Sequence, residues 1–172
     1  MLQVSNDDLD KLEPLFDRYQ KPLYNFFLKL SGDADASEDL VQNLFIRIMK
    51  YKNTYRGDHK FRTWIYQMAR NLFYDYYKKE VKVRDGFLKV ETMGDQDLVR
   101  EEDYSEIEER EEKLRNAMDQ LSDDKKEVLI MSKFQGMKYE EIAKVTDTSV
   151  SNVKVKVHRA INNLREVYFQ IA

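Results

Sequence analysis

The chain has 172 residues, a formal net charge of −3, five glycines, two prolines and no cysteine. The length suits one large domain or two small ones, and the scarcity of Gly and Pro favours helices over a turn-rich β architecture. The lack of cysteine excludes a disulfide framework and thiolate metal sites. Because there is no signal-peptide pattern and no apolar run as long as a membrane span, we expect a cytoplasmic protein without membrane insertion.

The first predicted helical region covers residues 9–31, where apolar side chains recur at steps of three and four. Pro14 and Pro22 interrupt this pattern, because proline lacks the amide that an interior helical position donates. The region is therefore expected to form either two helices or one helix with a break. Gly32 is expected to end it.

A second helix is predicted to run to about Lys50. Asp35 and Glu38 resemble a capping box at its start, with Asp35 as the N-cap. Residues 51–60 break the helical period and are predicted to form a loop that is both basic and aromatic. Residues 61–79 resume the helical pattern.

Aromatic and basic residues alternate in this loop and helix, a combination that single-stranded nucleic acid favours because rings stack on bases and cations bind phosphates. The alternative is a helix whose rings pack inward and whose cations are only solvated. Trp64 and Phe73 are expected in the core on either interpretation. Tyr51, Tyr55 and Tyr74 are less easily explained by packing, which favours the nucleic-acid interpretation.

Residues 83–106 are strongly acidic, lack a clear period and are predicted to be a linker. We favour a solvating spacer over a segment that mimics nucleic acid. Two further helices are predicted over residues 107–121 and 123–135, with Ser122 as an N-cap and Gly136 as the end. The apolar face expected for the second of these is Val128, Leu129, Met131 and Phe134.

The last part of the chain holds two short amphipathic segments separated by Thr and Asp, a pattern typical of a helix-turn-helix. Ser149 is expected to cap the second segment. No acidic residue occurs from Ser149 through Arg165, as a helix in a DNA major groove requires. Spacing alone leaves an ordinary amphipathic hairpin equally open. The apolar stripe of the second segment is Val150, Val153, Val157, Ala160, Ile161 and Leu164.

Patterns typical of enzymes and of metal or cofactor sites are not found. The two histidines, His59 and His158, are far apart and have no metal-ligand spacing around them. There is no glycine-rich phosphate loop and no nucleophile constellation. We therefore expect no catalytic residue, no metal and no cofactor.

Four motifs in this order resemble bacterial RNA polymerase sigma factors of the extracytoplasmic-function group. They are DLVQNLF at residues 39–45, FRTWIYQMARNLFYD at residues 61–75, YEEIAKV at residues 139–145 and SVSNVKVKVHRAINNLRE at residues 149–166. The resemblance covers nearly all of the chain. The pair of matched regions in order is more specific than either region alone.

The resemblance implies an all-α fold of two small helical domains joined by an acidic linker. Residues 1–82 correspond to sigma region 2, residues 83–106 to the linker, and residues 107–172 to region 4 with its helix-turn-helix. A member of this family is not an enzyme. It binds core RNA polymerase through the β′ clamp helices and the β flap, directs it to promoter DNA, and is commonly regulated by an anti-sigma factor.

The resemblance also implies three sets of site residues. The residues expected to bind core polymerase are Asp39, Gln42 and Phe45. Those expected at the promoter −10 element and in melting are Tyr51, Lys52, Tyr55, Arg56, Lys60, Arg70, Asn71, Tyr74 and Lys78. Those expected at the −35 element are Ser151, Asn152, Lys154, Val155, Lys156, His158 and Arg159. In general, Asn can bond adenine bidentately, Arg can bond guanine, and Val can contact a thymine methyl.

The sequence departs from the family pattern around the helix-turn-helix. Asp147 replaces the usual Gly of the turn, and Asp tolerates a left-handed backbone better than most residues. Thr146 and Thr148 replace usual apolar residues, which predicts a less tightly packed turn. Lys138 replaces the Ser or Thr that usually caps the first helix.

Two other functions are compatible with parts of the pattern. A stand-alone helix-turn-helix regulator needs a dimerisation face, whereas the N-terminal half offers a basic aromatic loop. A helical adaptor that binds only protein does not need a recognition face free of carboxylates. Loss of DNA discrimination on substituting Lys156 and Arg159 by alanine separates an adaptor from a DNA reader.

Overall fold

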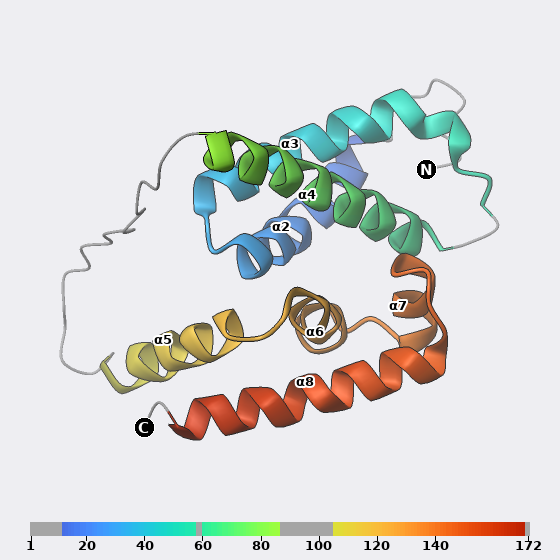
Figure 1. Cartoon of the computed structure of the whole chain (residues 1–172). Coiled ribbons are helices and arrows are strands. Elements are labelled where there is room, and N and C mark those ends of the chain that lie inside the picture. Colours follow the sequence, from blue (N-terminus) through green and yellow to red (C-terminus); the bar gives the residue numbers. More distant parts are fainter. Residues whose placement is uncertain (1–11, 58–59, 87–104, 171–172) are drawn as a thin grey trace.

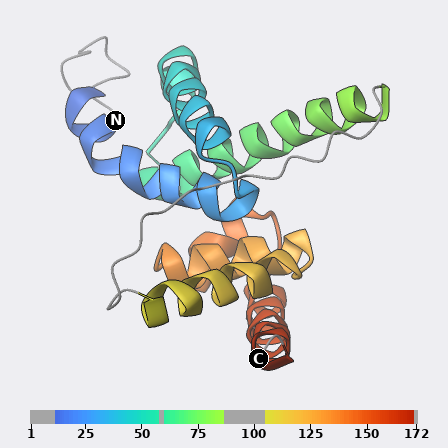
Figure 2. The ribbon, with the colours of Figure 1, turned by 90° about the vertical axis from the view of Figure 1, so that its left-hand side faces the viewer.

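The computed structural model describes residues 12–57, 60–86 and 105–170, and in these ranges the chain forms helices and no strand. This confirms the predicted all-α fold. The helices form two groups stacked on each other, α2 to α4 and α5 to α8 (Figures 1 and 2). None of the helices described is both long and apolar enough to cross a membrane. Most of the predicted linker, residues 87–104, lies outside the described residues, as does the predicted helix start at residue 9.

Helix α2 spans Leu12–Ser31 as one helix that contains Pro22, so the alternative of two helices is wrong. The side chains of Leu23, Phe26 and Phe27 after the proline are fully buried. Their packing outweighs the helical hydrogen bond that Pro22 cannot donate.

The turn between α2 and α3 places the start of α3 earlier than predicted. Gly32 ends α2 with φ of 75°, as predicted. Helix α3 spans Ala34–Tyr51, and the Asp33 carboxylate accepts the Ala36 amide at 3.0 Å. Asp33 is therefore the N-cap, and the prediction of Asp35 was wrong. Because the chain reverses at Gly32, the extended backbone that an N-cap needs falls on the next residue.

A short 3-10 helix, η2 (Lys52–Thr54), and a loop follow α3, in agreement with the predicted break. Helix α4 spans Phe61–Gly86, longer than the predicted 61–79. It therefore enters the segment predicted as linker. The added residues have no apolar period, but Lys, Glu and Arg favour a helix by intrinsic propensity.

Within residues 105–170 the chain forms four α-helices and one π-helical segment. Helices α5 and α6 precede the predicted helix-turn-helix, which is formed by α7 and α8. Their bounds are α5 (Ser105–Asp119), α6 (Asp123–Leu129), η3 (Ile130–Phe134), α7 (Tyr139–Val145) and α8 (Val150–Gln170).

The predicted helix 123–135 changes geometry half way, where α6 passes into the wider π-helical turns of η3. Gly136, with φ of 58°, follows it as the predicted end. Phe134 was predicted on the apolar face but is 39% exposed, so that prediction was wrong. The π-helical turns change the direction of the side chains that follow. The Lys29 ammonium instead lies 4.2 Å from the centre of the Phe134 ring.

The start of α6 is at the predicted position but is stabilised differently. Ser122 is the N-cap residue, yet its hydroxyl donates to Asp124 Oδ1 at 2.8 Å and does not bond a helical amide. The acids in the first turn of α6 remain favourable there, because the helix dipole is positive at its N-terminus.

The two halves share one buried cluster of apolar side chains, which runs from Leu23 in α2 to Ala160 in α8. Helix α4 packs on α7, and α2 packs on η3 and α6. The N-terminal half therefore lies directly against the C-terminal half, through α2 and α4 on one side and α6, η3 and α7 on the other.

Candidate nucleic-acid interface

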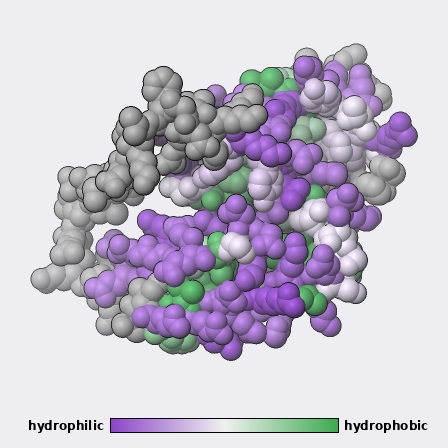
Figure 3. Space-filling model, in the orientation of Figure 1, coloured by the Kyte–Doolittle hydropathy of each residue, from purple (hydrophilic) through white to green (hydrophobic). Residues whose placement is uncertain are grey.

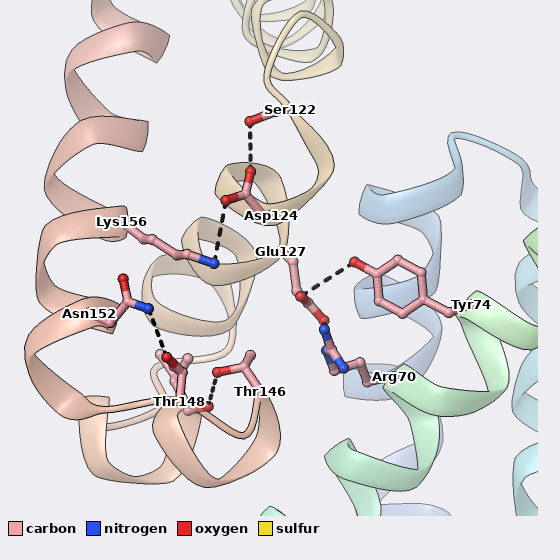
Figure 4. A network of polar contacts seen from close by, with 10 residues as sticks. Arg70, Tyr74, Ser122, Asp124, Glu127, Thr146, Thr148, Asn152 and Lys156 are labelled. Atoms are coloured by element: carbon pink, nitrogen blue, oxygen red, sulfur yellow. Dashed lines mark hydrogen bonds and ion pairs between the residues drawn. The ribbon is translucent and has the colours of Figure 1, made fainter.

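The turn between α7 and α8 is held by hydrogen bonds. Asp147 has φ of 51°, which confirms the expected left-handed residue at this position. The hydroxyl of Thr146 donates to the Ile142 carbonyl at 2.8 Å, and the hydroxyl of Thr148 accepts the Asn152 side-chain amide at 2.8 Å (Figure 4). The two threonines that replace apolar residues thus bond locally in the turn.

The starts of the two helices of the motif are stabilised in different ways. The Ser149 hydroxyl accepts the Asn152 amide at 3.1 Å, which confirms Ser149 as the cap of α8. At the start of α7 the Glu141 carboxylate accepts the amide of the N-cap residue Lys138 at 3.0 Å, which is one half of a capping box, while the bond that a Ser or Thr cap would accept from a helical amide is missing. Although partial burial acts against it, the bond from the Lys138 amide and the Lys60 ammonium at 3.2 Å lower the pKa of Glu141.

Helix α8 buries Val153, Val157 and Ala160 against the other helices of its half. Six of the seven residues predicted at the −35 element lie on the opposite, exposed side of α8, and they share a polar or basic face with one exposed valine. These residues are Ser151, Asn152, Lys154, Val155, His158 and Arg159.

Lys156, the seventh residue, lies at the edge of that face. It is half-buried, and its ammonium is 3.4 Å from Asp124 Oδ2 in α6 (Figure 4). Bonds from Ser122 and from Lys156 lower the pKa of Asp124. A base contact by Lys156 requires it to leave Asp124, just as a bidentate adenine contact by Asn152 requires it to leave Thr148.

The polar side of α4 faces the C-terminal half, where Arg70 and Tyr74 meet Glu127 of α6 (Figure 4). Arg70 Nε lies 2.6 Å from Glu127 Oε1, and the Tyr74 hydroxyl donates to Oε2 at 3.4 Å. Glu127 is only 2% exposed. Burial raises the pKa of Glu127, although Arg70 opposes this rise, and burial with the nearby Glu127 raises the pKa of Tyr74 to about 12.

About two turns earlier on the same side of α4, Arg62 and Tyr66 meet Gln135, which follows η3. Arg62 donates to the Gln135 carbonyl, and the Tyr66 hydroxyl donates to Gln135 Oε1 at 2.6 Å. The amide nitrogen of Gln135 donates to the Pro22 carbonyl of α2 at 3.1 Å. Gln135 thus bonds two helices of the N-terminal half at once. Burial of the Tyr66 side chain raises its pKa to about 12.

The remaining residues predicted at the −10 element divide into exposed and packed side chains. Tyr55 is half-buried, with its ring centre 5.6 Å from Phe61 and 5.5 Å from Trp64, so packing explains its position. Lys52 is also half-buried. The exposed residues of this set, apart from Lys60, are Tyr51, Arg56, Asn71 and Lys78.

The residues predicted to bind core polymerase lie on α3. Asp39 and Gln42 are exposed, and Gln42 lines a shallow groove with Phe16 and Val41. Phe45 is only 6% exposed, and its ring centre lies 4.7 Å from that of Phe16. Phe45 therefore supports this surface from below, and Phe16 is the exposed ring beside it.

A second groove lies between α5 and α8 and has a volume of about 540 Å³. Its walls are mainly apolar, and Figure 3 shows an apolar patch in this area of a largely hydrophilic surface. Its charged lining residues are two arginines and one glutamate. The lining residues include Arg110, Leu114, Ile161, Leu164, Arg165 and Tyr168.

Glu127 and Gln135, two residues that bond α4, were not among the residues predicted from the sequence. The only signal for Glu127 was its position directly before the apolar run Val128–Met131. No sequence signal marked Gln135, since the π-helical segment that positions it was not predicted. Among the residues described, no group of three His, Cys, Asp or Glu is arranged to hold a metal ion.

Comparisons with known proteins agree with the two-part organisation. Residues 15–83 match the family Sigma-70 region 2, and residues 111–164 match Sigma-70, region 4. The chain is 31% identical over 157 residues to the ECF RNA polymerase sigma factor SigX of Bacillus subtilis, covering 88% of this chain and 80% of SigX. It is 29% identical over 158 residues to the RNA polymerase sigma factor YlaC of the same organism, covering 91% of each.

Two solved structures share the fold. The sigma factor RpoE of Bartonella quintana, solved with the anti-sigma factor NepR, has a TM-score of 0.72 and 24% identity over 91% of this chain and 96% of RpoE. CnrH, solved with the cytosolic domain of CnrY, has a TM-score of 0.76 and 18% identity over 99% of this chain and 96% of CnrH. From the two matched regions and the relatives that cover most of its length, the chain belongs to the extracytoplasmic-function group of RNA polymerase sigma factors, which are transcription initiation factors that bind RNA polymerase.

Proposed function

We propose that this protein directs core RNA polymerase to a specific set of promoters by reading the −35 element with α8. The observation that carries the proposal is the exposed face of α8, which is polar and basic and lies in a stretch without acidic residues from Ser149 through Arg165. A carboxylate on this face would be repelled by phosphates. Arg159 and Val155 are suited to guanine and to a thymine methyl, respectively.

We further propose that the loop after α3 and the exposed side of α4 bind and help to open the −10 element. Tyr51, Arg56, Asn71 and Lys78 supply an exposed ring, an amide and cations for this purpose. Arg70 and Tyr74 complete the predicted surface only when they are released from Glu127. We propose that residues 1–82 form region 2, residues 83–106 the linker, and residues 107–172 region 4.

We propose two protein-binding surfaces. We assign the exposed side of α3 around Asp39 and Gln42 to the β′ clamp helices, with Phe16 as an apolar contact. The apolar groove between α5 and α8 is the candidate site for the β flap. By analogy with the solved RpoE relative, an anti-sigma factor is the proposed regulator. The protein acts in the cytoplasm, the compartment that it must share with the polymerase.

The test is in vitro transcription with purified core RNA polymerase from the same organism on a pool of its promoter fragments. We expect a discrete subset of start sites only when the protein is present. Arg159→Ala is expected to reduce discrimination among these promoters by about 1–3 kcal/mol. Arg115→Ala, which removes the same charge from an exposed site on α5, is the matched control and is expected to leave discrimination unchanged.

Other outcomes assign other functions. If the protein binds core polymerase but starts no transcription, it acts as an inhibitor. If it does not bind polymerase and binds duplex DNA tightly by itself, a stand-alone regulator replaces the proposal. If Arg159→Ala and Arg115→Ala discriminate among promoters equally well, Arg159 does not read the −35 element and the role proposed for α8 is wrong.

A further inference from the structure

The face of α4 that carries Arg70 and Tyr74 is occupied by the chain's own C-terminal half. These residues continue a row with Arg62 and Tyr66 at four-residue spacing, which places all four on one side of the helix. Each of them bonds Glu127 or Gln135 in the structure. We propose that this contact is an intramolecular latch, which holds the protein closed and masks part of the surface that binds opened promoter DNA.

The chemistry of Glu127 makes it a direct competitor of nucleic acid. Its carboxylate bonds the Arg70 guanidinium at 2.6 Å and the Tyr74 hydroxyl at 3.4 Å, which are the groups that a phosphate and a base would use (Figure 4). Arg70 cannot form a close ion pair with Glu127 and with a phosphate at the same time without bringing two anions together. Closure and DNA binding by these residues therefore exclude each other.

Gln135 joins the latch to the scaffold of the N-terminal half. Its side chain accepts from Tyr66 and donates to the Pro22 carbonyl, so it bonds α4 and α2 together. The π-helical segment η3 directly precedes it. Such segments occur often at functional sites, and here the wider turn aims Gln135 between the two helices.

The polar bonds of the latch lie beside apolar side chains that the two halves share, so opening must also expose part of that shared cluster. The hydrogen bonds of the latch can be replaced by water, and Lys60 with Glu141 forms an additional ion pair at the exposed edge. Relative motion is the default for domains of one chain unless their interface is large and hydrophobic. Each half also has buried residues of its own, such as Phe27 and Leu40 in one and Val153 and Val157 in the other.

The proposal rests on the proposed role of α4 in binding the −10 strand, and the experiment separates the two. The chain has no cysteine, so cysteines introduced at exposed Asp35 in α3 and exposed Asn116 in α5 accept a donor and an acceptor dye without competing sites. Energy transfer in the full-length protein reports closure. Fluorescence anisotropy with a pool of labelled single-stranded oligonucleotides, at one fixed salt concentration, reports DNA binding.

The perturbing variants lie in the C-terminal half and outside the predicted DNA-binding sets. Glu127→Gln removes the competing charge, and Gln135→Ala removes the bonds to Tyr66 and Pro22. Glu140→Gln is the matched control, because it removes one carboxylate from an exposed position of the same half. Circular dichroism checks that each variant is folded, and Gln135→Ala carries the test if Glu127→Gln does not fold.

We expect energy transfer to fall in both latch variants and to stay at the wild-type value in Glu140→Gln. The ratio of closed to open protein should decrease at least tenfold. Single-stranded DNA affinity should rise by the same factor as the open fraction, because apparent affinity scales with the population that can bind.

Unchanged energy transfer in both latch variants overturns the latch, whatever the DNA result. Reduced energy transfer with unchanged DNA affinity shows that closure does not mask the surface and overturns the masking. If no form of the protein binds single-stranded DNA, the proposed −10 function fails, while the energy-transfer result still decides whether the latch exists.

Discussion

Replacing Asp147 in the α7–α8 turn by glycine is expected to stabilise the protein, and replacing it by alanine is expected to destabilise it. Asp147 has φ of 51°. This left-handed conformation costs an ordinary L-residue about 1–2 kcal/mol and costs glycine almost nothing. Aspartate lies between these cases, because its short side chain can bond locally.

The magnitude follows from two opposing terms. Glycine removes the left-handed strain, but its greater freedom in the unfolded chain costs about 0.5–1 kcal/mol relative to alanine. The difference leaves the glycine variant about 1 kcal/mol more stable than the alanine variant. For a chain of this length, that corresponds to about 2–4 °C in Tm.

Thermal and urea unfolding of Asp147→Gly and Asp147→Ala measure this difference. Glu112 in α5 is the matched control, because it is exposed inside a helix, where alanine is more stable than glycine by about 1 kcal/mol. The order of glycine and alanine should therefore be opposite at the two positions. If the alanine variant is as stable as the glycine variant at position 147, the left-handed backbone at this residue does not limit stability. The angle between α7 and α8 must then be set by other contacts.

Two further predictions concern α8 and the boundary between the halves. Val157→Ala should lower the free energy of unfolding by about 2 kcal/mol, because Val157 is 1% exposed. Val155→Ala, at a residue 45% exposed, should change it by less than about 0.5 kcal/mol but weaken promoter selection; equal unfolding free energies for the two variants would contradict the assigned faces. Burial raises the pKa of Tyr66 from 10.0 to about 12, so its stabilising contribution is complete below pH 10 and is lost as pH rises through about 12. That loss is on the order of 2–3 kcal/mol, should disappear in Tyr66→Phe, and is measured by urea unfolding across this pH range.

The faces of the helices could be predicted from the sequence because a helical period is a local property. Val153, Val157 and Ala160 are spaced so that any helix places them together, and they are buried as expected. Val150, predicted on the same stripe, is 41% exposed, so that part of the prediction was wrong. Turn residues with strong conformational preferences, such as Gly32 and Asp147, were predicted for the same reason. In these cases the physical cause lies within a few residues of its effect.

Local ambiguity explains the errors at helix starts and ends. Asp33 and Asp35 are both good caps, and which one is used depends on where the chain leaves Gly32. Pro22 is unfavourable in any isolated helix, but burial of Leu23 and its neighbours outweighs that cost. Phe134 left the predicted apolar face because a π-helical turn is not encoded by a simple period.

The occupancy of the −10 surface could not be predicted, since its cause lies far away in the sequence. Arg70 and Tyr74 were assigned to nucleic acid because a cation beside a ring suits a phosphate and a base. A carboxylate satisfies the same two groups, and Glu127, 57 residues after Arg70, supplies it. The residue types on α4 therefore define which ligand chemistry fits, but they do not distinguish a DNA strand from an acidic side chain of the same protein. Because both ligands fit the same residues, one surface of α4 can serve closure and DNA binding. Substitution of Glu127 should therefore weaken closure without removing a group that binds DNA.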